Sequence, residues 1–196
     1  MSLPKTQECT EAQADSQNAT DPSAIELLIP ECLNGDRLAM QQLYDRCSRK
    51  IYALMVRMVG RQDADDLTQQ CFLQLFKNLE QFGGQSKLET WIYRLAANEA
   101  LMHLRRQKRQ HRGSLAAEPA IEHEDLIVKN EEAELLEQAL LKLDPELRTI
   151  ISLQEEHGLS YRDIAETLGI PEGTVGSRLN RARKDLRAEL LRLGWT

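Results

Sequence analysis

The residues best suited to chemistry in this 196-residue chain are arginines in its C-terminal part, where Arg178, Arg181 and Arg183 lie close together. A guanidinium group is always charged and presents several donors in a rigid fork, so it binds phosphate oxygens and guanine edges well. The chain as a whole carries a formal net charge of -6. A local cluster of arginines in an acidic chain indicates a surface for a polyanion.

Charge is segregated along the rest of the sequence in the same way. Residues 87–112 carry seven Lys or Arg against two acids, and residues 171–196 carry six against three. Residues 118–146 between them carry ten acids against two Lys, and residues 1–36 carry seven acids and one Lys. Because charges attract locally within a Debye length, the two basic segments indicate two surfaces for nucleic acid. One patch taken alone is better explained as a solvated helix face.

Enzymatic chemistry has less support. Asp63, Asp65 and Asp66 could hold magnesium in a nuclease, but adjacent helix positions fan around the axis and no His or Lys is obviously placed to assist. The chain has four scattered cysteines, which are Cys9, Cys32, Cys47 and Cys71. They form no C-x-x-C pair and have no His at metal-ligand spacing, so the last three are expected to be reduced core thiols. We predict no catalytic residue, no metal and no cofactor.

The candidate residues must be positioned by helices. Apolar residues recur at three- and four-residue spacing without strand-like alternation, which predicts an all-α fold. The expected helices are 30–47, 49–59, one that begins with Asp63 as N-cap, 88–108, 131–143, and one that begins at Asp144 and Pro145. The apolar stripe of the third helix is Ala64, Leu67, Cys71, Leu75 and Leu79. One face of the fourth helix carries Trp91, Leu95, Met102 and also Asn98.

The elements form two small helical domains joined by a flexible linker. We expect an acidic, disordered tail at 1–24, a first domain at 25–110, the linker at 111–130 and a second domain at 131–196. The N-terminus has no apolar leader, and no segment approaches the ~18 apolar residues that span a bilayer. The sequence therefore predicts no membrane insertion and a cytoplasmic location.

Residues 160–181 match a helix-turn-helix. Ser160 caps a short helix, Gly169 makes the turn, and Pro171 fits the first turn of the second helix. The apolar stripe of that helix is Val175, Leu179, Ala182, Leu186 and Leu190. Its opposite face presents Thr174, Ser177, Arg178 and Arg181. Small, hydroxylated and cationic side chains there favour entry into the DNA major groove, the alternative being an ordinary pair of helices.

Two longer blocks carry a family resemblance. DADDLTQQCFLQLFKNLEQFGGQSKLETWIYRLAANEALMHLRRQKR resembles region 2 of the sigma-70 family, and LDPELRTIISLQEEHGLSYRDIAETLGIPEGTVGSRLNRARKDLRAEL resembles region 4. With both blocks in this order, the chain is similar to the short extracytoplasmic-function sigma factors. The resemblance implies a region 2 helical bundle and a region 4 helix-turn-helix. It also implies an initiation factor that binds core RNA polymerase, recognises the -10 and -35 promoter elements and assists DNA melting.

The resemblance assigns roles to residues at matching positions. Those that would dock on the clamp helices of the polymerase β′ subunit are Asp63, Asp66, Leu67, Gln70 and Phe72. Those that would contact the -10 element are Phe82, Gly84, Ser86, Lys87, Arg94, Asn98, Arg105 and Arg106, with Lys108 and Arg109 also tracking phosphates. Those that would contact the -35 element are Arg162, Glu172, Gly173, Thr174, Ser177, Arg178 and Arg181.

Structural alternatives stay open for several of these residues. Asp63 and Asp66 also suit a helix start, and Leu67 and Phe72 also suit a core. The loop before residue 88 could be a simple connection, and Asn98 could be a buried amide satisfied by backbone.

The sequence departs from the family pattern at two positions. The family usually has Glu where this chain has Gln70, which removes a charge from the clamp contact. It usually has a polar residue where this chain has Met102, which leaves the identity of the -10 bases open.

The implied partners are core RNA polymerase, through its β′ clamp helices and β flap, promoter DNA and, as for many family members, an anti-sigma factor. Twenty linker residues span roughly 25 Å as a coil and ~65 Å when extended, so the linker does not fix the spacing of the domains. We therefore expect the polymerase to set that spacing, and the free chain to bind promoter DNA poorly. The competing hypothesis is a polymerase-independent helix-turn-helix regulator, which would prefer a palindrome.

Overall fold

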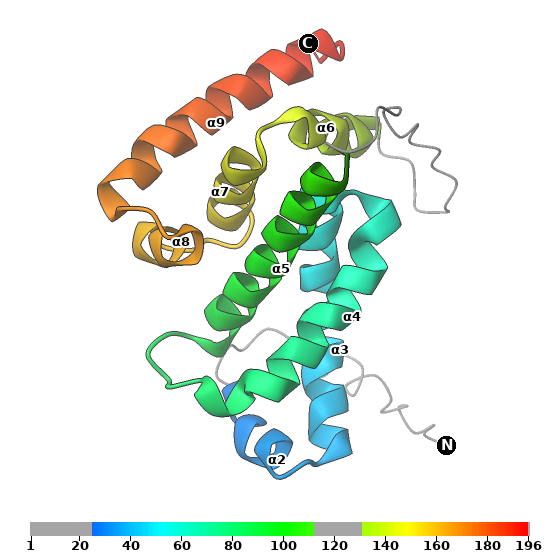
Figure 1. The fold of residues 1–196 in the computed structure, drawn as a ribbon, viewed down its shortest axis with the longest axis vertical. Helices are drawn as coiled ribbons and strands as arrows, with labels where there is room; N and C mark the ends of the chain where they lie inside the picture. Colours follow the sequence, from blue (N-terminus) through cyan, green and yellow to red (C-terminus); the bar gives the residue numbers. More distant parts are fainter. Residues whose placement is uncertain (1–24, 112–130, 196) are drawn as a thin grey trace, which may run out of the picture.

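The computed structural model describes residues 25–111 and 131–195, and the regular structure in these ranges is helical, as predicted (Figure 1). The first domain contains α2 (Ile29–Leu33), α3 (Arg37–Val59), α4 (Arg61–Asn78), the 3₁₀ turn η1 (Leu79–Gln81) and α5 (Leu88–His111). The second domain contains α6 (Glu131–Lys142), α7 (Pro145–Glu155), α8 (Tyr161–Leu168) and α9 (Glu172–Arg192). The predicted tail at 1–24 and linker residues 112–130 lie outside the described residues. Among the described helices, none is both long and apolar enough to cross a membrane.

Helix α3 is one continuous element, so the predicted break between helices 30–47 and 49–59 was misplaced. The chain instead breaks at 34–36, between α2 and α3. The Asp36 side chain caps its start by accepting a hydrogen bond of 2.8 Å from the backbone amide two residues on. Gly60 ends it with a φ of 89°. Buried residues Leu43, Cys47 and Ile51 continue at four-residue spacing through the predicted break. No Gly or Pro interrupts this segment, so nothing in it stops a helix.

Helix α4 begins at Arg61, three residues earlier than the predicted N-cap Asp63 implies. Its N-cap is Gly60, and Asp63 lies in the first turn instead. The predicted apolar stripe is confirmed, because Ala64, Leu67, Cys71, Leu75 and Leu79 are each at most 3% exposed. The three described cysteines are buried free thiols, as predicted.

The buried face of α5 is not the face that carries Trp91, Leu95, Asn98 and Met102. It consists of Leu88, Ile92, Tyr93, Ala96, Ala97, Ala100 and Leu101. On that other face, Asn98 and Met102 are exposed, and Trp91 and Leu95 are only partly buried. Three alanines on the buried face allow close approach of α5 to its neighbours. Periodicity of large apolar residues does not detect such packing.

The helix ends of the second domain follow the predicted pattern. Asp144 caps α7 and Pro145 occupies its first position. Ser160 and Asp163 form a capping box at the start of α8. Gly169 ends α8 in the left-handed conformation, with a φ of 64°, which a side chain would disfavour.

Helix α9 carries the second half of the helix-turn-helix. Pro171 is its N-cap residue, one position before the predicted place in the first turn. Val175, Leu179 and Ala182 are fully buried, and the later stripe residues Leu186 and Leu190 are partly buried. The turn therefore holds α8 and α9 through the apolar contacts that the sequence predicted.

The two domains pack directly against each other. Helices α3 and α5 of the first domain contact α6, α7 and α8 of the second (Figure 1). Leu140, Leu147 and Ile151 belong to one continuous hydrophobic cluster with the core of the first domain. The linker estimate left the separation of the domains open, whereas these contacts define it within the chain itself.

Candidate nucleic-acid interface

Helix α5 presents a polar and cationic face to solvent. Asn98, Met102, Arg105 and Arg106 are exposed along it, so the alternative of a buried Asn98 was wrong. A shallow hollow of about 530 Å³ is lined by Met102, Arg105, Arg106, Lys108 and Arg109. Cations around an apolar side chain suit a single strand, because phosphates pair with arginine while an unstacked base covers the apolar surface.

The loop before α5 is held by an aromatic contact. The ring of Phe82 packs against the ring of Trp91 with centroids 5.6 Å apart, so Phe82 supports the loop. Gly84 is exposed and has a φ of 66°. Lys87 is exposed, and the Ser86 hydroxyl donates a long hydrogen bond of 3.4 Å to its carbonyl. A polar loop with a cation thus lies at the N-terminal end of α5.

Arg94 of α5 is engaged by the second domain. Its Nη2 donates a hydrogen bond of 2.6 Å to Oδ1 of Asp163, and its Nη1 lies 2.7 Å from Oε2 of Glu166. Burial alone would raise the pKa of Asp163, but hydrogen bonds from Ser160 and Arg94 hold it below its usual range. Asp163 is therefore ionised at neutral pH, and Arg94 faces two carboxylates of α8.

The predicted polymerase-docking residues of α4 divide into two groups. Asp66 and Gln70 are exposed. Leu67 and Phe72 are each 3% exposed, and the Phe72 ring packs against Tyr44 with centroids 4.6 Å apart. Leu67 and Phe72 are therefore core residues that position the exposed pair.

Asp63, the fifth predicted docking residue, points towards α5. Its Oδ2 lies 3.0 Å from Nε2 of His103 and accepts a hydrogen bond of 3.0 Å from Gln107. The sequence did not predict a histidine beside the acidic residues at the start of α4. Only the packing of α4 on α5 brings His103 to Asp63. Within the described ranges, no three Asp, Glu, His or Cys side chains are placed to hold a metal ion.

Sequence reasoning missed Leu73 on the exposed face of α4. Its side chain is 69% exposed and lies one turn beyond Gln70, so the two share a face. Phe76, a further turn on, is only partly buried. The sequence could have indicated this exposure, because Leu73 falls outside the apolar stripe that was predicted to form the core. An exposed apolar side chain among polar ones is typical of an interface anchor when a partner covers it.

The outer face of the helix-turn-helix is available as predicted. Exposed residues on it are Arg162, Glu172, Gly173, Ser177 and Arg181, with Thr174 and Arg178 half-buried. Thr174 donates its hydroxyl hydrogen to the Pro171 carbonyl at 2.7 Å, and Ser177 donates to the Thr174 carbonyl at 2.9 Å. The hydroxyl oxygens keep lone pairs that can accept further hydrogen bonds.

The two arginines of this face differ in their partners. Nη1 of Arg178 lies 2.7 Å from Oε2 of Glu146 on α7. Arg181 has a side chain that is 73% exposed and lies 3.6 Å from Asp185 on the same helix. Because a long, exposed pair is weak, Arg181 gives up its partner at a smaller cost than Arg178 does.

The junction between the domains contains two adjacent titrating residues. A shallow cavity of about 490 Å³ there is lined by residues that include Arg57, Tyr93, Glu156 and His157. Burial raises the pKa of Glu156 to about 7, although its ion pair with Arg57 opposes the shift. Burial and the charge of Arg57 lower the pKa of His157 to about 4. Both side chains are therefore pushed towards their neutral forms.

Comparisons with known proteins match both domains. A sequence profile described as Sigma-70 region 2 matches residues 43–110, and one described as Sigma-70, region 4 matches residues 133–186. The ECF RNA polymerase sigma-E factor of Haemophilus influenzae is 34% identical over 170 residues, which cover 80% of this chain and 90% of that protein. The ECF RNA polymerase sigma factor SigW of Bacillus subtilis is 33% identical over 182 residues, which cover 85% of this chain and 96% of that protein.

A solved structure has a similar fold. It is the sigma factor RpoE of Bartonella quintana in complex with the anti-sigma factor NepR. The TM-score is 0.67 at 24% sequence identity, over 79% of this chain and 97% of that one. The likeness concerns the arrangement of the helices.

Proposed function

Because the chain belongs to the sigma-70 family, in the extracytoplasmic-function group of RNA polymerase sigma factors, we propose that three of its surfaces divide the work of transcription initiation. As a member of this group, the chain directs transcription together with RNA polymerase. In our proposal α4 docks on core polymerase, α5 with its preceding loop binds the -10 element, and α8 with α9 binds the -35 element.

The observation that carries the proposal is the exposed row on α5. Asn98 has an amide that can pair with a base edge, most simply that of an adenine. Met102 beside it offers an apolar surface to an unstacked base, and Arg105 and Arg106 neutralise phosphates. Gly84, Ser86 and Lys87 extend this surface at the N-terminal end of α5, where close approach of backbone and a cation favour a flipped base.

The docking surface on polymerase is the exposed face of α4. Asp66 and Gln70 supply its polar contacts, and Leu73 supplies an apolar anchor between them and the end of the helix. Core residues Leu67 and Phe72 hold this face in place from below. The partner surface that we assign is the β′ clamp helices, with Asp63 contributing through its contact to His103 and not directly.

The second domain reads the -35 element through the start of α9. Arg162, Glu172, Gly173, Thr174, Ser177, Arg178 and Arg181 form this surface. Gly173 has open space where a Cβ would stand, which lets the helix end approach DNA closely. Arg178 must exchange Glu146 for a phosphate or base, whereas Arg181 is available already. The same domain binds the β flap of polymerase.

A protein inhibitor of the anti-sigma class is a further proposed partner. Its support is that the similarly folded RpoE was solved in complex with the anti-sigma factor NepR. We place the action of the chain in the cytoplasm, where bacterial RNA polymerase works.

Run-off transcription tests the proposal. Purified core polymerase is supplied with a pool of promoter fragments, with and without this chain. We expect specific transcripts that require the chain, and no specific footprint of the chain alone at physiological salt. Footprints on a palindrome without polymerase, together with no chain-dependent transcript, would instead establish the regulator hypothesis.

A further inference from the structure

We infer that the free chain is held closed by its own second domain, in which the α8 carboxylates Asp163 and Glu166 occupy the phosphate-binding position of Arg94. The inference rests on the proposed role of α5 in binding the -10 element. It assigns α8 a second task, as a competitor of DNA, besides its place in the helix-turn-helix.

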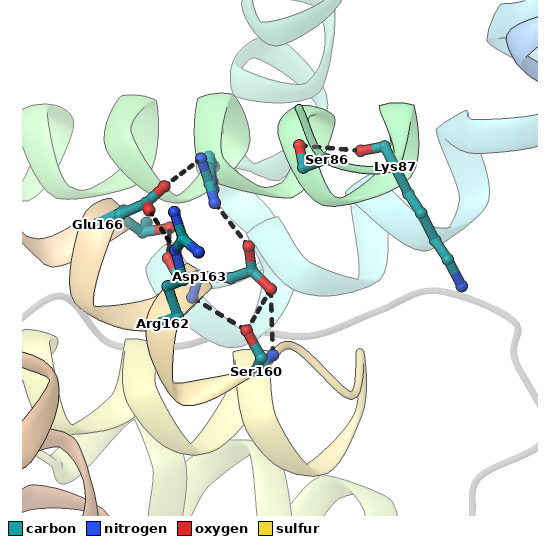
Figure 2. Close-up of polar contacts among 8 residues, drawn as sticks. Ser86, Lys87, Ser160, Arg162, Asp163 and Glu166 are labelled. Carbon is teal, nitrogen blue, oxygen red and sulfur yellow. Dashed lines mark hydrogen bonds and ion pairs between the residues drawn. The ribbon is translucent and has the colours of Figure 1, made fainter. Parts of the chain in front are cut away.

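The two carboxylates bind the guanidinium nitrogens through which Arg94 would bind phosphate oxygens. Two nitrogens of the Arg94 guanidinium face two carboxylate oxygens, at 2.6 Å for Asp163 and 2.7 Å for Glu166. Figure 2 shows both acids on the side of α8 that faces α5, with Ser160 and Arg162 beside them. Arginine binds phosphate by donating two hydrogen bonds to two anionic oxygens. The carboxylates of Asp163 and Glu166 together supply two such oxygens, and so they occupy the place of one phosphate group.

The polarity of the whole junction supports the same conclusion. In the parts of the chain that the structure describes, the ion pairs across the junction are Arg57–Glu156, Arg61–Glu137, Arg94–Asp163 and Arg94–Glu166. In each of them the first domain supplies the cation and the second supplies the anion. This distribution of charges is the one expected if the second domain takes the place of a polyanion on the cationic surface of the first.

Closure and engagement of DNA by Arg94 exclude each other. The Arg94 side chain is 22% exposed, and its fork is occupied by α8. A phosphate can take its place only when α8 withdraws, which moves the second domain away from the first. Asn98, Arg105 and Arg106 stay exposed in the closed chain, so closure weakens DNA binding without abolishing it. The measured affinity is reduced in proportion to the fraction of open chain.

Glu166→Gln in the full chain is the direct test, because Glu166 is not itself one of the residues assigned to DNA or polymerase. Its other ion pair, with Arg162 on the same helix, is exposed and therefore weak. The matched control is Glu155→Gln, which removes the same charge. Glu155 has a side chain that is 46% exposed against 45% for Glu166, but its partner Arg183 lies within the second domain. Binding of a fluorescein-labelled, random-sequence single-stranded DNA is followed by anisotropy, and compactness by small-angle X-ray scattering.

We expect Glu166→Gln to bind the DNA about three- to tenfold more tightly than the unaltered chain, and to have a larger radius of gyration. Glu155→Gln should bind within about twofold of the unaltered chain and stay compact, because general electrostatics are changed equally. Equal effects of the two variants on both measurements would overturn the inference.

A second pair of variants guards against effects on α8 itself. Asp163→Asn weakens both the Arg94 contact and the capping box, whereas Ser160→Ala weakens only the capping box. Opening by Asp163→Asn but not by Ser160→Ala supports the inference, and equal opening by both contradicts it. Circular dichroism confirms that each variant is folded.

Transcription separates this inference from the proposed function. With core polymerase present, Glu166→Gln should support promoter-specific transcripts at least as well as the unaltered chain. Absence of transcripts from the unaltered chain would refute the proposed function. If Glu166→Gln does not open while transcription stays intact, the inferred closure is refuted and the proposed function still stands.

Discussion

The imidazole of His157 lies against the ring of Tyr93 with centroids 4.1 Å apart, and this contact joins the end of α7 to α5. Its neighbour Glu156 pairs with Arg57 of α3 at the same junction. Burial moves the pKa values of the two adjacent residues in opposite directions, to about 7 for Glu156 and about 4 for His157. Their contributions to stability therefore respond oppositely to pH.

The pH dependence of unfolding should reveal this opposition. The Glu156 contribution is present below its ordinary pKa of 4.5 and is lost as pH rises towards 7. The His157 contribution is present above its ordinary pKa of 6.5 and is lost as pH falls towards 4. Relative to the unaltered chain, acidification should lower the free energy of unfolding of Glu156→Gln and raise that of His157→Gln, by at most about 1.4 kcal/mol per pH unit. Urea unfolding at several pH values measures this, and parallel profiles of the two variants would contradict it.

Gln70→Glu should strengthen binding to core polymerase. The substitution supplies the charge that the family usually has at this exposed position of α4, and the expected gain is about three- to fivefold in Kd at low salt. Gln69→Glu, at the neighbouring exposed position, is the control with the same change in charge. Fluorescence titration of labelled chain with core polymerase gives both values, and an equal gain in the two variants would argue against a specific contact.

Leu73→Ala should weaken the same interaction. An exposed leucine that becomes covered by a partner contributes about 1–3 kcal/mol, so Kd should rise roughly five- to hundredfold. The stability of the free chain should be unaffected, because the side chain is 69% exposed. A comparable loss in Leu38→Ala, whose side chain is 74% exposed on α3, would show that the effect is not specific to α4.

Arg181→Ala should reduce both the affinity for -35 duplex DNA and its salt dependence. The plot of log K against log salt has a negative slope, and loss of one phosphate contact makes that slope less steep by about 0.9. Arg183→Ala is the control on the same helix, because Arg183 pairs with Glu155 within the domain. Anisotropy titrations over a range of salt concentrations, on promoter fragments from which the chain directs transcription by polymerase, distinguish the two variants. An unchanged slope in Arg181→Ala would remove this residue from the interface.

Two glycines of the helix-turn-helix should respond oppositely to alanine. Gly169 has a φ of 64°, so Gly169→Ala should destabilise the second domain by about 1 kcal/mol or more. Gly173 lies in the first turn of α9 with open space around its Cβ position, so Gly173→Ala should stabilise by about 0.4–1 kcal/mol. Thermal unfolding of both variants tests the pair, and a stabilising Gly169→Ala would contradict the turn geometry.

Local features of this protein could be predicted from the sequence because they depend on near neighbours. The caps at Asp144 and Ser160 and the turn at Gly169 follow from side-chain oxygens and backbone freedom within a few residues. The stripe of α4 follows from the helical period. The face of α5 could not be predicted in this way, because small alanines form its core side and large apolar residues lie outside.

The sequence by itself determined two helical domains, their charge and the outer face of the helix-turn-helix. Tertiary structure alone decided that Asp63 meets His103, and that Arg94 meets Asp163 from 69 residues further along the chain. An ion pair between distant residues depends on how helices pack, and the same arginine in the sequence is equally suited to a phosphate or a carboxylate. Charge pattern predicted a cationic surface on α5, and packing determined that an anion of the same chain lies on it.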